Sequence, residues 1–297
     1  MPADTLAHYN DLRANDLPTT DSLFHIMNKI VETMNHLPSK AYLTVLSFLL
    51  LGLLAYPAYA TTKDKTLKIT SSQWPPFVDK AAAGNGVAMD LVSKIFARAG
   101  YKTNTSVQNW NRALQGTSMG ITDIIATAWY TPERNKTLHY SKPYFENTIR
   151  FVKRKGVNIP FNSFNDLQGL TVGVVNGYAY GETFNTAPGL IRIPKNNLIQ
   201  NILLLQRGQL DLVIGDEWVI RSELTEYFPS AIKDYEFLGK PVDKRGVHIA
   251  VSRQLKNHKQ IVTDFNKALD SMIKDGSYKK LIDAYRSKLI ILQKTPL

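Results

Sequence analysis

An α/β fold is predicted for residues 61–297, because short apolar runs alternate there with longer segments of helical periodicity. A second observation is that the segment contains two similar halves, each with strands whose carboxyl ends lead into a helix carrying polar groups. The third is composition, since 44% hydrophobic residues can supply a substantial core. Ligands bind outside the carboxyl ends of strands in open α/β sheets, so two such halves predict a cleft between them.

The expected strands are short apolar runs that stop at turn residues. The run 123–127 (DIIAT) continues into a helix start, 170–175 (LTVGVV) stops before Gly177, and 210–214 (LDLVI) stops at Gly215. Together with two further runs, strands are expected at 67–70, 123–127, 170–175, 210–214 and 246–251.

The expected helices are segments in which apolar residues recur every three or four positions. Gly100 ends the first of them, and Asp275-Gly276 separates the last two. Thr131 and Pro132 suit the cap and the first position of a further short helix. The other helices are expected at 87–99, from 110 to at least 114, at 178–184, at 198–206 and in two pieces over 258–288.

The first 60 residues are interpreted as an N-terminal extension plus a signal peptide. The apolar run 41–55 is 15 residues long and carries no charge, follows Lys40 and precedes the A-x-A pattern of residues 58–60. It is short for a membrane span, although an uncleaved anchor is the alternative. The chain is therefore expected in the periplasm, cleaved near Ala60.

The start of the chain is unusual for an exported protein, and the part after the expected cleavage site is basic. Met27 or Met34 would give a more ordinary signal peptide than Met1. Residues 61–297 contain 33 basic and 20 acidic residues, a net charge of +13. The basic residues are scattered, and an exported protein has little access to nucleic acid, so a solvated basic surface is expected and no nucleic-acid partner.

Several reaction types lack motif support. There is no cysteine, no G-x-G-x-x-G, no phosphate-binding loop and no pair of histidines at i, i+4, so no cofactor and no metal is expected. The segment 116–120 matches G-x-S-x-G, but a helix precedes it and a strand follows it, the reverse of a hydrolase. No catalytic residue is predicted. Asp216-Glu217 could act in acid–base chemistry or could simply begin a helix.

Large aromatic residues cluster at predicted strand ends and helix starts, where they would either line a pocket or pack in the core. They are Trp74, Phe77, Trp110, Trp129, Tyr130, Tyr178 and Tyr180.

Arg134 is a candidate ligand-binding residue because it stands in the first turn of a helix, where a positive charge is disfavoured. A guanidinium at such a position can bind a carboxylate with two hydrogen bonds. Asp216, in the other half, would supply the opposite charge. The two residues are therefore predicted to hold a zwitterion, with its carboxylate at Arg134 and its ammonium at Asp216.

Residues 67–285 resemble the family 3 periplasmic solute-binding proteins, the receptors of polar amino-acid ABC transporters. The motifs that carry the resemblance, in chain order, are Trp74-Pro75-Pro76-Phe77, Met89-Asp90-Leu91-Val92, Thr131-Pro132-Glu133-Arg134, Tyr140-Ser141-Lys142-Pro143-Tyr144, Asp166-Leu167-Gln168-Gly169, Val172-Gly173-Val174, Asp211-Leu212-Val213-Ile214-Gly215-Asp216, Phe265-Asn266-Lys267-Ala268 and Asp275-Gly276-Ser277-Tyr278.

The resemblance implies a two-lobed periplasmic-binding-protein fold that closes like a flytrap, with two crossover strands as hinge. Lobe 1 would be 61–152 plus 246–297, and lobe 2 would be 153–245. It also implies that Arg134 binds a ligand carboxylate, that Asp216 binds its amino group, and that Trp74 or Phe77 packs on the ligand. A monomer that delivers a small ligand to a membrane ABC permease is expected, and no enzyme.

This sequence departs from the family pattern near the predicted site. Trp129 and Tyr130 stand where small hydroxyl residues are usual, the loop there is one residue shorter around Thr127, and Tyr178 replaces a Ser or Thr. The expected ligand is a small polar molecule, an amino acid or a related carboxylate, and the bulkier, aromatic-lined pocket could also suit another small carboxylate or a cation. The alternatives are a ligand sensor and an enzyme resembling cyclohexadienyl dehydratases, which would need a cleft carboxylic acid with a raised pKa and no cationic partner.

Overall fold

The computed structural model describes Lys29 and residues 66–294, with side chains described up to residue 285. The chain separates into two compact units, Met1–Thr61 and Thr62–Leu297, and every element below belongs to the second. The expected signal peptide lies outside the described residues. Within them, no helix has both the length and the apolar character that crossing a bilayer requires.

The second unit is built on one mixed sheet, in which the order of the main strands is β2-β1-β3-β10-β5-β8-β6-β7. β4 pairs with β10, and β9 pairs with β5. The strands are β1 (Thr66–Ser71), β2 (Lys102–Val107), β3 (Ile124–Trp129), β4 (Leu138–Tyr140), β5 (Phe145–Arg154), β6 (Thr171–Val175), β7 (Ile191–Lys195), β8 (Leu212–Asp216), β9 (Tyr235–Phe237) and β10 (Asp243–Ser252).

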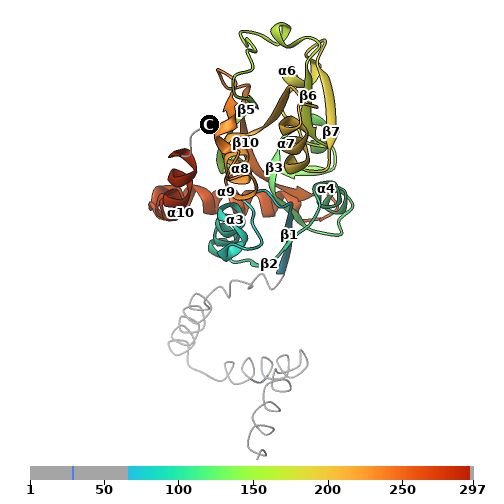
Figure 1. The fold of residues 1–297 in the computed structure, drawn as a ribbon. Coiled ribbons are helices and arrows are strands. Elements are labelled where there is room, and N and C mark those ends of the chain that lie inside the picture. The colour runs from blue at the N-terminus through green and yellow to red at the C-terminus, as the bar shows by residue number, and fades with distance from the viewer. Residues whose placement is uncertain (1–28, 30–65, 295–297) are drawn as a thin grey trace, which may run out of the picture. The chain divides into compact units, whose positions relative to one another are not determined.

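Two long antiparallel strands, β5 and β10, connect the halves of this sheet (Figure 1). On one side, β1, β2 and β3 are parallel to one another, and on the other side β6, β7 and β8 are parallel. This arrangement confirms the expected two-lobed fold with two crossover strands. The proposed lobe boundaries at 152/153 and 245/246 fall inside β5 and β10 and remain a prediction.

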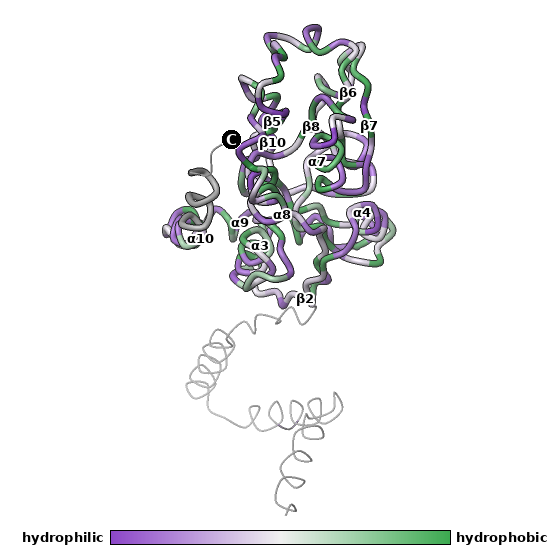
Figure 2. The backbone as a smooth tube through the Cα atoms, viewed as in Figure 1, coloured by the Kyte–Doolittle hydropathy of each residue, from purple (hydrophilic) through white to green (hydrophobic). Residues whose placement is uncertain are grey.

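The helices pack on both halves, and Figure 2 shows hydrophilic and hydrophobic residues mixed along them, as expected of helices with one buried side. They are α3 (Val87–Arg98), α4 (Trp110–Ser118), α5 (Pro132–Asn135), α6 (Glu182–Thr186), α7 (Leu198–Gln206), α8 (Glu217–Tyr227), α9 (His258–Lys274) and α10 (Ser277–Lys294), with short 3-10 turns at Ala83–Asn85, Phe164–Leu167 and Ile232–Asp234.

The core of the first half joins helices that lie far apart in the sequence. Phe265 of α9 is fully buried and lies 5.1 Å, between ring centroids, from the buried Phe96 of α3. The predicted strands and most predicted helices are present, including the pair α9 and α10 divided at Asp275-Gly276.

The helix expected at 178–184 is wrong, because α6 begins only at Glu182. Gly181 has a φ of +116°, which a helix does not allow. In addition, the Tyr180 hydroxyl accepts a hydrogen bond from the Val175 backbone N–H at 2.9 Å. This contact ties the irregular loop 178–181 back to the end of β6.

Candidate functional site

A cavity of about 430 Å³ lies at the carboxyl ends of strands from both halves of the sheet. Its walls come from the segments that directly follow β1, β2, β6, β7 and β8, which is the position that the strand pattern predicts. Its lining includes polar, charged and aromatic side chains, among them Ser72, Trp74, Lys80, Asn109, Trp110, Tyr178, Tyr180, Asn197, Asp216 and Glu223.

Asp216 ends β8, caps helix α8 and faces this cavity. Its Oδ1 accepts hydrogen bonds from the backbone N–H groups of Trp218 at 2.9 Å and Val219 at 3.0 Å. Its Oδ2 is buried without a geometrically formed hydrogen bond, and the nearby side-chain amide of Asn147 favours the charged form. Burial raises the pKa of Asp216 to about 7, although the two backbone donors favour the charged form.

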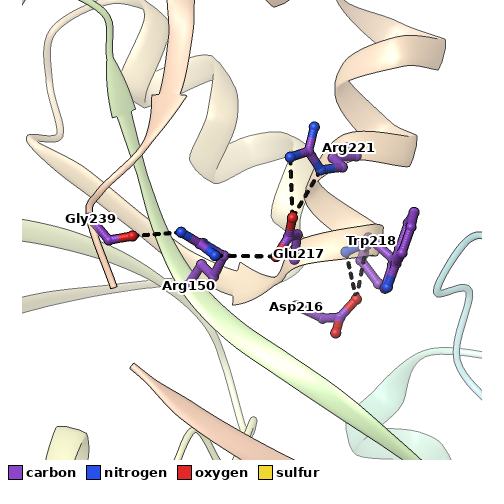
Figure 3. Close-up of polar contacts among 7 residues, drawn as sticks. Arg150, Asp216, Glu217, Trp218, Arg221 and Gly239 are labelled. Atoms are coloured by element: carbon purple, nitrogen blue, oxygen red, sulfur yellow. Dashed lines mark hydrogen bonds and ion pairs between the residues drawn. The ribbon is translucent and has the colours of Figure 1, made fainter. Parts of the chain in front are cut away.

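The neighbouring Glu217 has a different environment. It lies between Arg150 at 3.4 Å and Arg221 at 3.1 Å, and it does not line the cavity. Figure 3 shows Glu217 directed at these two guanidinium groups, whereas Asp216 points away from them. Of the two adjacent carboxylates, only Asp216 therefore lacks a cationic partner.

Glu223 is a second buried carboxylate in the same cavity. Its exposed fraction is 7%, and its Oε2 has no hydrogen-bond partner among the described residues. Burial, followed by the nearby Glu226, raises the pKa of Glu223 to about 8. Glu223 follows Asp216 by seven positions, nearly two helical turns, so both carboxylates project from one side of α8.

Aromatic rings form much of the remaining wall. Trp74, Trp110, Tyr178 and Tyr180 all line the cavity, and the ring of Tyr178 packs edge-on against Trp110 with centroids 5.7 Å apart. The one basic residue among the lining side chains is Lys80, and it is exposed. Two buried acids without a cationic partner among the described residues, inside an aromatic cavity, fit a ligand that carries positive charge.

Arg134 lies outside this cavity. Thr131 accepts a hydrogen bond from the Arg134 backbone N–H at 3.1 Å, so the expected cap and the Pro132 start of α5 are confirmed. The guanidinium donates to two backbone carbonyls, Trp129 O at 2.9 Å and Gly177 O at 2.6 Å. It packs 5.1 Å from the centroid of the Trp110 ring, and burial lowers the pKa of Arg134.

A second, much smaller cavity of about 20 Å³ adjoins Arg134. Ser72, Trp74, Trp110 and Tyr178 line both cavities and form their common wall, and Thr127 and Trp129 complete the small one. The structure thus brings Trp74, Trp110 and Tyr178 together with Asp216, and it leaves Arg134 on the other side of these rings.

The remaining predicted residues have other surroundings. Thr127 bonds Ser71 at 2.5 Å between hydroxyl oxygens. Phe77 lines neither cavity and packs between Trp74 and Phe145 in the core. Tyr130 lines neither cavity and is 42% exposed.

Sequence reasoning missed Glu223 altogether. The available signal was its spacing of seven residues from Asp216, which places two acids on one face of a helix that starts at the predicted site. It also missed the cap residues Asn109 and Asn197, which begin α4 and α7 at the cavity wall.

A ligand-sized cavity between two α/β halves joined by crossover strands is the architecture of the periplasmic solute-binding proteins. Residues 67–288 match the family model of bacterial extracellular solute-binding proteins, family 3, and the chain belongs to this family. The resemblance inferred from the motifs is thereby confirmed.

Relatives with assigned ligands share about a quarter of their residues with this chain. The L-arginine-binding protein of Pseudomonas aeruginosa is 25% identical over 256 residues, which cover 82% of this chain and 96% of that protein. ABC transporter arginine-binding protein 1 of Escherichia coli strain K12 is 26% identical over 168 residues, which cover 54% of this chain and 65% of that protein. The solved structure of an ancestral arginine-binding protein bound to arginine is 26% identical, with a TM-score of 0.64 over 74% of this chain and 97% of that one.

Proposed function

We propose that this chain is the solute-binding component of an ABC importer and that it captures a small organic cation, either a basic amino acid or an amine related to one. The observation that carries the proposal is that two buried carboxylates without a cationic partner among the described residues, Asp216 and Glu223, line one cavity of about 430 Å³. A buried carboxylate without a partner is costly, and a cationic ligand would supply the missing charge.

The relatives support the same reading, since several are named for binding arginine. In this proposal Asp216 binds one cationic group of the ligand. Trp74, Trp110 and Tyr178 contact its apolar part, and cation–π attraction adds to the binding. Arg134 holds the two halves together through the Gly177 carbonyl. A monomer would suffice, since the cavity is complete within one chain, and export by the signal peptide would place it in the periplasm with a membrane permease as partner.

One observation favours an enzyme on the same fold. Asp216 is a cavity carboxylic acid with a raised pKa and without a cationic partner, which is the feature that a dehydratase-like acid requires. Glu217 does not meet that requirement, because Arg150 and Arg221 both pair with it. A binding function is preferred to an enzymatic one because a second acid, Glu223, lies in the same cavity. Proton transfer requires one acid, whereas two acids can both stabilise a bound cation.

Thermal melting of the purified protein against arginine, lysine, ornithine, histidine, agmatine and cadaverine tests the proposal. A ligand of the native state should stabilise the protein by about 2.7 kcal/mol at one hundred times its dissociation constant. Asp216→Asn should abolish this effect. Glu133→Gln should not, because Glu133 is exposed and lines neither cavity.

Two results would decide against the proposal. If none of these cations stabilises the protein, capture of an organic cation is wrong. If a cation binds and mass spectrometry then finds it converted, the enzyme reading replaces the binding reading.

A further inference from the structure

The loop that follows β6, in the second half of the sheet, reaches the first half at Gly177. The Gly177 carbonyl accepts two hydrogen bonds from the first half, one from Trp110 Nε1 at 2.9 Å and one from Arg134 Nη2 at 2.6 Å. Trp110 begins α4 and Arg134 lies in α5, so both donors are far from Gly177 in the sequence. Two side chains of one half therefore bind one carbonyl of the other half directly.

The backbone at Gly177 approaches the first half so closely that only glycine fits there. Gly177 has a φ of +76°, and an added Cβ would lie 2.4 Å from Asn111 Oδ1 and 3.4 Å from the Trp110 ring. The distance to Asn111 is shorter than any ordinary contact, so a larger residue would push the two halves apart. Gly177 is therefore a point at which the halves touch.

Tyr178 extends this contact with its side chain. Its ring packs edge-on against Trp110 and against Trp129, with both centroid distances at 5.7 Å. Trp129 is held from the connecting strand β5, because its Nε1 donates to Oδ1 of the buried Asn147 at 2.9 Å. Aromatic pairs of this geometry attract one another beyond the effect of their buried area, so the Tyr178 ring adds to the attraction between the halves.

Each side of the contact is fixed within its own half. The Tyr178 backbone N–H donates to Val175 O at 3.1 Å, and the Tyr180 hydroxyl accepts from the Val175 N–H at 2.9 Å, so the loop is tied to β6. Arg134 is tied to the first half, because its Nη1 donates to Trp129 O at 2.9 Å. Groups that are already ordered lose little conformational entropy when they meet.

This contact does not exclude a ligand from Arg134. A guanidinium carries five N–H groups, and the carbonyls of Trp129 and Gly177 use two of them. Trp110 and Tyr178 also line the large cavity, so the residues that join the halves are part of the wall that a ligand would touch. The contact between the halves and a bound ligand are therefore compatible in one closed arrangement.

We infer that these contacts form an interlobe clasp, which by itself favours closure of the two halves. The clasp consists of Gly177 and Tyr178 on one side and of Trp110, Trp129 and Arg134 on the other. Trp110 is then a positioning residue, because its indole N–H acts on ligand affinity through closure. This consequence for affinity rests on the proposed function. An apparent dissociation constant equals the intrinsic one divided by the fraction of molecules that are competent to bind, so the clasp strengthens binding.

Trp110→Phe tests the clasp, because it removes the indole N–H and keeps an aromatic ring. The chain has no cysteine, so Gln115→Cys on α4 and Gln206→Cys on α7, both at exposed positions, can carry two spin labels. Pulsed electron spin resonance on the dialysed protein then measures the ratio of closed to open molecules. Loss of one neutral hydrogen bond should lower this ratio about fivefold.

Trp218→Phe is the matched control. The Trp218 side chain lines neither cavity, and its hydrogen bond to Asp216 comes from the backbone N–H, which Phe retains. The ratio should therefore stay at the wild-type value. Tyr178→Leu weakens the clasp from the other half and should also lower the ratio, so the test does not depend on the folding of one variant.

Three results would overturn the clasp. The first is a wild-type protein that shows only the open distance between the labels. The second is an unchanged ratio in both Trp110→Phe and Tyr178→Leu. The third is an equal fall of the ratio in Trp110→Phe and in Trp218→Phe, since that would indicate a general effect of losing an indole.

Calorimetry with arginine and lysine tests the link to binding. In Trp110→Phe both affinities should fall by one common factor, the ratio of the two closed fractions, because the closed fraction multiplies every affinity. Unequal losses would assign the effect to a ligand contact and overturn the positioning role. If no cation of the thermal-melting panel binds the unmodified protein, the proposed function fails, while the spin-label distances still decide on the clasp.

Discussion

Replacing Asp216 by Asn separates the structural role of this side chain from its charge. Asn caps helices about as well as Asp, so its side-chain oxygen can still accept from the backbone N–H groups of Trp218 and Val219. The substitution removes the only ionisable group at that position. Any change of stability that depends on pH can therefore be assigned to the carboxyl group.

The direction follows from the pKa of Asp216, about 7 in the folded protein against an ordinary value of 3.8. Between these pH values the folded protein keeps a proton that the unfolded chain has lost. The free energy of unfolding of the wild type should therefore fall as the pH rises from 4 to 7. The difference between the two pKa values corresponds to about 4 kcal/mol in the free energy of unfolding. The Asn variant has no carboxyl group and should not lose this stability.

Urea denaturation of both proteins without ligand, at pH values from 4 to 8, measures the effect. The Asn variant should gain stability relative to the wild type through this interval and keep a constant advantage above it. Asp216→Ala is the control, because it removes both the carboxyl group and the helix cap. It should be about 1 kcal/mol less stable than the Asn variant at every pH. Parallel curves for the wild type and the Asn variant would refute the claim that Asp216 is buried without compensation.

Three other predictions follow from the same structure. Cation affinity should rise from pH 6 to pH 9, because Asp216 and Glu223, with pKa values near 7 and 8, must lose their protons; calorimetry showing constant affinity would contradict this. Gly177→Ala should weaken ligand binding and lower the melting temperature, because Gly177 has a φ of +76° and an added Cβ would lie 2.4 Å from Asn111 Oδ1; an unchanged melting temperature would count against this contact. Phe265→Ala should cost about 3–5 kcal/mol of stability in urea denaturation without altering binding stoichiometry, and a loss below 1 kcal/mol would contradict its place in the core.

The elements of the site that depend on local chemistry were predictable from the sequence. The cap at Thr131, the Pro132 start and the acid at the end of β8 all follow from neighbouring residues. The alternation of strands and helices likewise predicted that these ends would meet at a cleft. The capping preferences act within a few residues of each position, and the rule for carboxyl ends of parallel strands needs only the order of the elements.

Contacts over long sequence separations were not predictable in this way. One partner of the Arg134 guanidinium is a backbone carbonyl 43 positions away, and no residue type indicates that a glycine will supply it. Arg134 and Asp216 were expected to share one ligand, yet the structure places Tyr178 and Trp110 between their cavities. The separation of Arg134 from the large cavity depends on how aromatic rings from the two halves pack. The identity of a single residue does not specify that packing.

The two raised pKa values also explain how such a cavity can exist before a ligand arrives. Near neutral pH, Asp216 and Glu223 each hold a proton for much of the time, so the empty cavity carries less charge than the sequence suggests. A cation entering the cavity favours the ionised forms and displaces those protons. Part of the binding free energy is then used to ionise the acids. The affinity of the site is consequently coupled to the pH of the surrounding compartment, and acidification should release the ligand.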